Sequence, residues 1–343
     1  MTTRAPRRGA ARLDPDAVRR TLRDAGIRAR HALSQNFLAD IDVLDGILAE
    51  ADPTPGRGVL EIGPGLGILT GGLVAAGAAV TAVELDPRLA AFLRQRFGDV
   101  LVDGGTAAAS PTTDARAGAE SDADLAVSAG SLRLVEGDAL DQDLTTLVPA
   151  PYDVVANLPY HITSPILHAL LGSTPRPERL VVMVQREVAE RIAAPPGRMS
   201  YLSVFVQYHA KVRIALDVPA AAFEPEPAVE SAVLVIEPFP EDDRLPDAAA
   251  EEELWRLVQA GFRERRKMLH NVLSRQLPVP PDVVARALEA SGIAPDRRPQ
   301  TLGVGEWLAL REALGPLGPD ERGRRRERQS RAAGSDDAGD DDR

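Results

Sequence analysis

Five short apolar runs, separated by stretches long enough for a helix, constrain the fold of this chain more than any other feature. Each run is rich in Val, Leu and Ile, and each is too short to be a buried helix. The runs are Val59–Ile62, Val80–Leu85, Leu132–Val135, Val154–Ala156 and Leu180–Val184. Strands that alternate with helices form a parallel sheet with helices on both faces. The sequence therefore predicts a doubly wound α/β fold.

The pattern changes after the fifth predicted strand. Two extended segments, 202–219 and 229–238, are separated by a proline-rich stretch, and they predict an antiparallel hairpin that closes the sheet. Residues 248–315 carry apolar residues at helical spacing, which predicts a small C-terminal α-helical domain.

The predicted domain organisation has further parts on either side of these. A flexible Arg-rich arm covers residues 1–30, and the sheet domain covers residues 31–240. Within the sheet domain, residues 103–130 are rich in Ala, Gly, Ser, Thr and Asp, which predicts a flexible insertion. The helical domain covers residues 248–315, and a disordered, charged tail follows at 316–343.

Composition excludes several classes of chemistry. The chain has no cysteine, so it can form no disulfide, thiolate metal site or thiol nucleophile. Its five histidines lack the paired spacing of a zinc site, and we expect no metal. No apolar run reaches about 18 residues and the N-terminus has no signal-peptide pattern, so we expect a cytoplasmic protein outside the membrane.

The net charge of −11 disfavours a nucleic-acid partner at first sight, because phosphate contacts require a basic surface. However, the acidic residues are concentrated in "AGAESDADLA" and "SDDAGDDDR", whereas "FRERRKML" is locally basic. A basic face on a folded domain is therefore compatible with an acidic chain. The Arg-rich first thirty residues are interpreted with equal weight as RNA-contacting or as solubilising.

A glycine-rich corner, "VLEIGPGLG", follows the first predicted strand. Gly63, Gly65 and Gly67 allow the backbone to approach a ligand closely, and the next helix offers unpaired N–H groups at its start. A dinucleotide fingerprint would require glycine at position 68, where the chain has Ile68. The corner instead resembles the nucleoside-binding corner of S-adenosylmethionine-dependent methyltransferases. A purely structural turn is the alternative.

Acidic residues mark the ends of the next two strands. Glu84 lies about 20 residues after the glycine corner, where doubly wound folds place a carboxylate against ribose hydroxyls. Asp138 follows the third strand and can accept a hydrogen bond from an adenine amine. Either acid alone is equally compatible with a helix cap. Because ligands bind at the carboxyl ends of such strands, we predict that Gly63, Gly65, Glu84 and Asp138 form one cofactor site.

The fourth strand ends in "ANLPYHITSPI", which carries the predicted catalytic residues Asn157 and Tyr160. The Asn157 side-chain oxygen and the Leu158 carbonyl, held in place by Pro159, could bind both protons of an adenine N6 amine. The lone pair of the N6 amine would then face a methyl donor. The Tyr160 ring offers a surface on which an extruded base can stack. A turn with a buried tyrosine is the alternative.

Several ordered motifs now define a family. "LSQNFLAD", "LEIGPGLG", "VELD", "EGDAL", "NLPYHITSPI", "VQREVAERI", "FEPEPAVESA", "FRERRKMLHNVL" and "LGVGEWLAL" make the chain resemble the ribosomal RNA adenine N6-dimethyltransferases of the small-subunit (KsgA) type. The resemblance covers roughly residues 30–315. It implies a Rossmann-like methyltransferase sheet, S-adenosylmethionine as methyl donor, and dimethylation of two adjacent adenosines in the 3′-terminal hairpin of small-subunit rRNA. The implied substrate is an assembling 30S particle, and we expect a monomer.

The resemblance also implies roles for single residues. Asn36 and Leu38 of "SQNFL" are expected to close over the cofactor, and Asn157 to lie between the cofactor and the target base. Tyr160 would stack on one face of the target adenine, and a second residue would be needed for the other face of this adenine clamp. The family often has an aromatic residue for this purpose after the fifth strand, where this chain has Val182, so the residue on the second face is not assigned. Phe223 is a candidate for it.

RNA binding is assigned to three basic residues. Arg265, Arg266 and Lys267 lie in "FRERRK", which is predicted to be part of a helix, and a solvated helix face is the alternative. Three other functions stay open at this point. They are methylation of large-subunit rRNA as in the macrolide-resistance enzymes, a non-catalytic role in ribosome assembly, and methylation of a small molecule.

Overall fold

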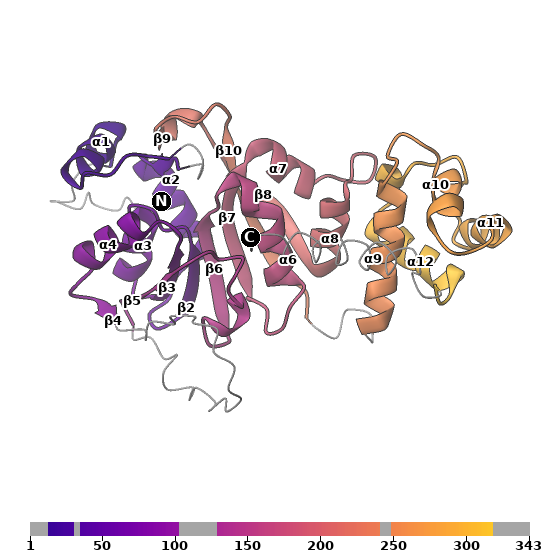
Figure 1. Cartoon of the computed structure of the whole chain (residues 1–343), viewed down its shortest axis with the longest axis horizontal. Coiled ribbons are helices and arrows are strands. Elements are labelled where there is room, and N and C mark those ends of the chain that lie inside the picture. Colours follow the sequence, from indigo (N-terminus) through magenta and orange to yellow (C-terminus); the bar gives the residue numbers. More distant parts are fainter. Residues whose placement is uncertain (1–12, 31–34, 103–128, 241–247, 318–343) are drawn as a thin grey trace, which may run out of the picture. The chain divides into compact units, whose positions relative to one another are not determined.

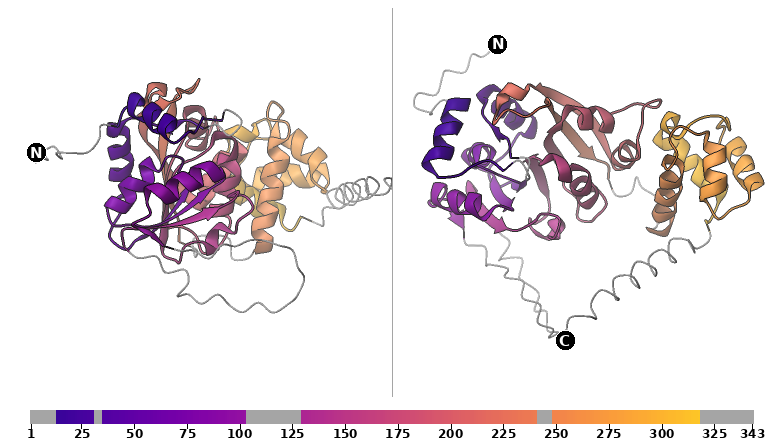
Figure 2. Two further views of the ribbon diagram at one scale, coloured as in Figure 1. Left: turned by 60° about the vertical axis from the view of Figure 1, so that its left-hand side comes forward. Right: turned by 45° about the horizontal axis from the view of Figure 1, so that its top comes forward.

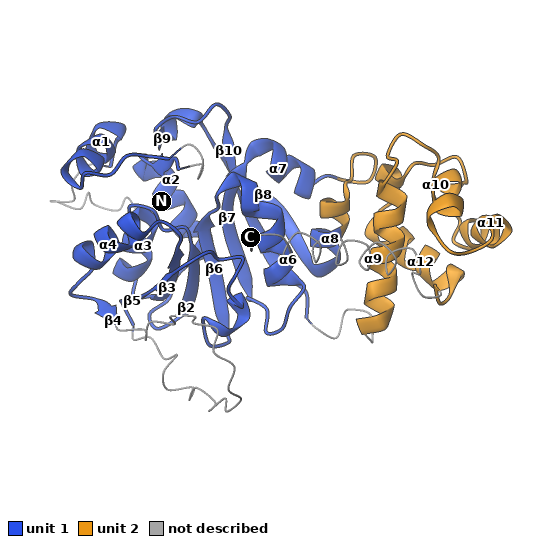
Figure 3. Cartoon of the chain, in the orientation of Figure 1, with its two compact units in different colours: residues 1–194, 205–241 blue, residues 195–204, 242–343 orange. Residues whose placement is uncertain are grey.

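The computed structural model of the chain (Figure 1) describes residues 13–30, 35–102, 129–240 and 248–317. Most of the predicted insertion and tail, and the first twelve residues of the predicted arm, lie outside these ranges. The chain divides into two compact units (Figure 3). The first unit comprises Met1–Ala194 and Phe205–Glu241, and the second comprises Pro195–Val204 and Asp242–Arg343.

An eight-stranded sheet forms the centre of the first unit, with the strand order β4-β5-β3-β2-β6-β7-β10-β8. The strands from β4 to β7 are parallel, whereas β10 pairs antiparallel with both β7 and β8. The strands are β2 (Gly58–Ile62), β3 (Ala79–Glu84), β4 (Leu101–Val102), β5 (Ser131–Glu136), β6 (Tyr152–Asn157), β7 (Arg179–Gln185), β8 (Ala210–Val218) and β10 (Ser231–Pro238). The predicted α/β fold and its five parallel strands are confirmed.

Helices bury the sheet because its strands are apolar on both faces. The helices that accompany the sheet are α2 (Ile41–Ala51), α3 (Ile68–Ala75), α4 (Pro87–Arg96), α6 (Thr163–Leu171) and α7 (Arg186–Ile192). Helices α2, α3 and α4 share one apolar core with β2, β3 and β5, to which Val59, Leu73 and Leu93 belong. Alternate strand residues such as Leu60 and Val154 are fully buried as well, as a doubly covered sheet requires.

The antiparallel edge of the sheet differs from the prediction in one part. Residues 202–209, predicted to be extended, belong to helix α8 (Tyr201–His209). The extended part of the predicted hairpin is therefore β8, which pairs antiparallel with β10. Ser200 and Ser203 exchange hydrogen bonds at the start of this helix: each backbone N–H donates to the other hydroxyl, at 2.8 and 3.2 Å. A short apolar run fits a helix or a strand, and here this reciprocal cap favours the helix.

Part of the predicted flexible arm is a folded helix, α1 (Pro15–Asp24). The Asp14 carboxylate accepts from the Ala17 N–H at 2.8 Å and so caps the helix. Val18 is buried in a small apolar cluster with Phe37 and Leu66, which holds the helix on the first unit. Helix α1 lies beside β9 (Phe223–Glu224), which pairs with β1 (Phe37–Leu38) (Figures 1 and 2).

The second unit is helical, as predicted for the C-terminal part. Its helices are α9 (Ala248–Phe262), α10 (Leu269–Gln276), α11 (Pro281–Ala290) and α12 (Val304–Leu314). The prediction that "FRERRK" is part of a helix is wrong beyond Phe262. Helix α9 ends at that residue, and residues 263–268 form a turn. This segment has no apolar residue between Phe262 and Met268 that could hold a helix against the unit. Within the described ranges, no helix has the length and apolar character needed to cross a membrane.

Candidate active site

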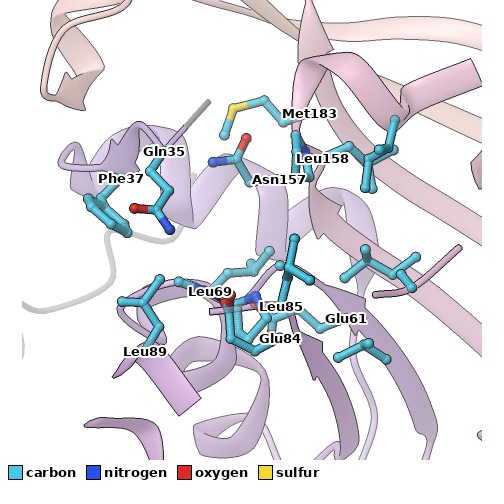
Figure 4. A pocket seen from close by; sticks show the side chains of 18 of the residues that line it. Gln35, Phe37, Glu61, Leu69, Glu84, Leu85, Leu89, Asn157, Leu158 and Met183 are labelled. Carbon is cyan, nitrogen blue, oxygen red and sulfur yellow. Dashed lines mark hydrogen bonds between the residues drawn. The ribbon is translucent and has the colours of Figure 1, made fainter. Parts of the chain in front are cut away.

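One pocket lies at the carboxyl ends of β2, β3, β5 and β6, entirely within the first unit (Figure 4). Eight of the sequence-predicted site residues line it: Asn36, Leu38, Gly63, Gly65, Glu84, Asp138, Asn157 and Tyr160. Parallel strands bring their carboxyl ends to the same edge, which explains how Gly63, Glu84 and Asn157 meet here. Arg265, Arg266 and Lys267 are not part of it. They are exposed in the turn of the second unit.

The glycine corner has a backbone that other residues rarely adopt. Gly63, Gly65 and Gly67 have φ values of +69°, +59° and +72°. The Gly63 N–H donates to the Val83 carbonyl at 2.9 Å, which ties the corner to β3. A β-carbon at Gly67 would lie 2.5 Å from Phe97, so this position also requires glycine for space. The corner therefore forms a tight rim over which a ligand can contact the backbone.

Glu84 joins the end of β3 to this corner. One of its carboxylate oxygens accepts from the Gly65 N–H at 3.0 Å, and the other accepts from the Asp86 N–H at 2.9 Å. Burial raises the pKa of the Glu84 carboxyl, and these backbone donors act in the opposite direction. Asp138 accepts from the Leu140 N–H at 2.9 Å and is partly exposed at the pocket. Both acids keep lone pairs that can accept from a ligand.

Glu61, at the end of β2, is a third acid of the pocket. Its side chain is 1% exposed and accepts from the Thr70 hydroxyl at 2.7 Å. Burial raises the pKa of Glu61 to about 8, and the neighbouring Glu84 adds to the rise. Glu61 and Glu84 lie on one side of the pocket, and Asn157 lies on the other (Figure 4).

The charge of the pocket decides which cofactors fit. Glu61, Glu84 and Asp138 are the acids that line it, and the described lining residues include neither Lys nor Arg. None of these lining residues offers a positive charge to a phosphate. The corner also has Ile68 where the dinucleotide fingerprint requires glycine, so a dinucleotide is disfavoured. The other lining residues include apolar side chains such as Leu69 and Leu85, and uncharged polar ones such as Gln35. A nucleoside that carries positive charge and no phosphate, as S-adenosylmethionine does, fits this donor set.

Asn157 ends β6 and is held from two sides. Its side-chain N–H group donates to the Asn36 carbonyl at 3.4 Å, so the amide nitrogen is engaged and the amide oxygen is left to accept. The next N–H, that of Leu158, donates to the Met183 carbonyl of β7 at 3.0 Å. The tyrosine that follows, Tyr160, shares a hydrogen bond of 2.9 Å with the Ser231 hydroxyl of β10. The ring of Tyr160 is thereby fixed at the pocket.

Several pocket residues were missed from the sequence. Gln35 and Phe37 belong to the "SQNFL" segment that was singled out, and Gln35 donates to Asp86 at 3.3 Å. Met183 pairs with Asn157 in the register of β6 and β7 and lies beside it (Figure 4). No sequence signal distinguishes Met183 from its apolar neighbours, because its place follows from the pairing of two strands.

The two positions discussed for the second face of the adenine clamp are both core positions. Phe223 is 2% exposed, belongs to the apolar core under the sheet and does not line the pocket. Val182 is fully buried. Strand β7 alternates its side chains between the two faces of the sheet, so Val182 turns away from the side to which Met183 points. Phe223 pairs with the pocket residue Leu38 in the register of β1 and β9, and its assignment to the clamp stays a prediction.

Comparisons with known proteins agree on one family. The model of the family described as ribosomal RNA adenine dimethylase matches residues 26–102 and 119–314. A ribosomal RNA small subunit methyltransferase A from Anaeromyxobacter sp. (strain K) is 41% identical, over 84% of this chain and 94% of that protein. The protein of the same name from Geobacter metallireducens is 39% identical, over 87% of this chain and 99% of that protein.

Two solved structures share the fold. A dimethyladenosine transferase from Plasmodium falciparum has a TM-score of 0.62 and 25% identity, over 80% of this chain and 95% of that one. The 23S rRNA methyltransferase ErmE has a TM-score of 0.60 and 28% identity, over 81% of this chain and 99% of that one. With its glycine corner, its acidic pocket and its Asn157 corner in one place, the chain belongs to the ribosomal RNA adenine dimethylase family.

Proposed function

We propose that this protein dimethylates the N6 amines of two adjacent adenosines in the 3′-terminal hairpin of small-subunit rRNA, with S-adenosylmethionine as its methyl donor. One observation carries the proposal: a single pocket, whose described lining has acids but no Lys or Arg, also contains the amide of Asn157 and the ring of Tyr160. The curated relatives, named as small-subunit methyltransferases, support this choice of ribosomal subunit.

The Asn157 corner suits a weakly nucleophilic amine. The lone pair of an adenine N6 amine is delocalised into the ring, so acceptors that bind its two protons help to direct the lone pair out of the ring plane. The Asn157 oxygen can accept one proton, since the amide nitrogen already donates to Asn36. The Leu158 carbonyl can accept the other. When bound, S-adenosylmethionine supplies an electrophilic methyl group and a neutral thioether leaving group.

The same acceptors stabilise the transition state. Positive charge develops on N6 as the new bond forms. The two oxygen dipoles are already oriented to stabilise this charge, so they do not have to reorganise. No base is needed before the attack, because the proton leaves afterwards. Tyr160, fixed by Ser231, offers its ring as the stacking surface for the extruded base. Such stacking contributes about 1–3 kcal/mol per base. Met183 is placed beside Asn157 for an apolar contact with the base.

The second unit is proposed to bind the RNA. Arg265, Arg266 and Lys267 form an exposed basic turn, and the charge of such a turn suits the phosphate backbone of an rRNA hairpin. The substrate proposed is rRNA within an assembling 30S particle. The enzyme is proposed to act there as a cytoplasmic monomer.

A second candidate is methylation of large-subunit rRNA. The likeness to the 23S rRNA methyltransferase ErmE, at 28% identity, is the observation that favours it. Mass mapping of methylated adenosines after incubation with isolated, unmodified subunits separates the two. Methylation of adjacent adenosines in small-subunit rRNA is expected, and incorporation into large-subunit rRNA alone would contradict the proposal.

The role of Asn157 is tested by Asn157→Ala. This change removes one acceptor, and we expect methyl transfer to fall by about 10²–10³-fold, as for the loss of one preorganised transition-state contact. RNA binding should persist, because the proposed RNA contacts lie in the second unit. The exposed Asn271 on α10 provides the matched control, Asn271→Ala, which should leave transfer unchanged. Full activity of Asn157→Ala would remove this mechanism.

A further inference from the structure

Glu61 is a buried acid with no cationic partner among the residues that the structure describes. Its side chain is 1% exposed, and its hydrogen bonds come from the uncharged Thr70: the hydroxyl donates at 2.7 Å, and the Thr70 backbone donates as well. In the described part of the chain no Lys or Arg lines the pocket, and no ion pair is formed by Glu61. A buried carboxylate is unfavourable unless a cation or several donors compensate it. A ligand of the pocket is therefore the available source of that compensation.

The groups that surround Glu61 favour a ligand with a positive charge. Strand β3 contributes a second buried acid, Glu84, whose charge disfavours a carboxylate at Glu61. Helix α3 contributes the Thr70 hydroxyl, and helix α2 contributes the apolar Ile47 to the same pocket. Two neighbouring acids with no Lys or Arg among the described lining residues favour a positive charge beside them.

We propose that Glu61 is the counter-charge by which this pocket distinguishes the cationic methyl donor from its product, S-adenosylhomocysteine. The proposal rests on the cofactor assigned under the proposed function. Transfer moves the methyl group from sulfur to N6, and the sulfur keeps the bonding electron pair. The ammonium and carboxylate groups stay on the product, whereas the sulfonium charge is lost. The attraction to a carboxylate is lost with it. Glu61 is thus a binding residue that favours donor entry and product release, and it does not touch the reacting amine.

Proton release follows from the same arrangement. In the free protein burial raises the pKa of Glu61 to about 8, so the carboxyl is largely protonated at neutral pH. A bound cation favours the ionised form, so donor binding should release a proton. The affinity for the donor should then rise with pH between about 6 and 8, whereas the affinity for the product should depend less on pH.

The experiment measures dissociation constants of S-adenosylmethionine and S-adenosylhomocysteine by calorimetry on the full chain, at pH 6, 7 and 8. Glu61→Gln is the main variant, because it keeps the shape and can still accept from Thr70. We expect it to weaken donor binding at pH 8 by about tenfold to a hundredfold and product binding by less than about threefold. The pH dependence of donor binding should flatten. Titrations in buffers of different ionisation enthalpy should show proton release by the wild type only.

A second variant distinguishes a change in the charge of Glu61 from misfolding of the protein. Thr70→Val keeps the side-chain shape and the backbone N–H but removes the hydroxyl that donates to the carboxylate, so the rise in the affinity for S-adenosylmethionine should move to higher pH. Equal weakening of donor and product by Glu61→Gln, or no weakening of either, would overturn the inference. Wild-type protein that fails to bind S-adenosylmethionine at all would instead contradict the proposed function.

Discussion

At the scale of single residues, the glycine corner offers a matched pair of positions. Gly67 and Gly56 have similar φ values, +72° and +77°, but a β-carbon meets Phe97 at 2.5 Å at the first and nothing within 4 Å at the second. Alanine at either position adopts an unfavourable left-handed backbone, which costs about 1–2 kcal/mol. Only Gly67→Ala adds overpacking, which typically costs about 1–3 kcal/mol.

We therefore expect Gly67→Ala to lower the free energy of unfolding more than Gly56→Ala does. Urea titrations followed by circular dichroism measure the difference. Tryptophan fluorescence is unsuitable, because both tryptophans, Trp255 and Trp307, lie in the second unit. Equal losses would show that Phe97 moves away at no cost.

Glu61 also makes the stability of the free protein depend on pH. Its pKa rises from about 4.5 in the unfolded chain to about 8 in the fold, so between these values the native state holds a proton that the unfolded state has lost. The free energy of unfolding should therefore fall as pH rises from about 5 to 8. Asp86 affects stability in a different pH range. Arg88 holds the pKa of the Asp86 carboxyl below its usual range, so the stabilisation that Asp86 provides is lost only as the pH falls below about 4.

Melting temperatures of the ligand-free wild type and of Glu61→Gln between pH 5 and 8 check this expectation. The decline toward pH 8 should be smaller in the variant, because glutamine carries no titrating proton. Parallel profiles for the two proteins would contradict the buried-acid account.

At the scale of elements, the sequence predicted the helices and strands that are determined by a local pattern of apolar residues. The five parallel strands were found because they are buried on both faces, and the strand ends then placed Glu84, Asp138 and Asn157 together. Local pattern did not determine α8, where an apolar run fits a helix or a strand equally well. It also did not reveal that α1 is a folded part of the first unit. A helix with one buried residue, Val18, is stabilised by packing partners far along the chain.

Helix α1 connects to the pocket through shared apolar residues. Phe37, Leu66 and Leu89 line the pocket and also pack in the cluster that contains Val18. An aspartate at position 18 would bury a charge or detach the helix, so Val18→Asp should weaken S-adenosylmethionine binding by about tenfold or more. Arg20→Asp introduces the same side chain at an exposed position of α1 and serves as the control. Unchanged binding by Val18→Asp would show that α1 does not support the pocket.

At the scale of the whole molecule, charge and chemistry are divided between the two units. The pocket lies within the first unit and is acidic, whereas the proposed RNA contacts lie in a basic turn of the second. The net charge of −11 therefore gives no sign of the basic turn. If the two units carry separate functions, RNA affinity and cofactor affinity should respond to different substitutions.

The combined change of Arg265, Arg266 and Lys267 to alanine tests this separation. RNA affinity should fall, and the slope of log affinity against log salt should become shallower by about two, because each lost phosphate contact removes about 0.7 from the slope for single strands. S-adenosylmethionine affinity should stay as in the wild type. The control replaces Arg286 and Arg298, two exposed arginines elsewhere in the second unit, with alanine. Equal losses of RNA affinity in both variants would indicate that general charge, rather than the turn after α9, holds the RNA.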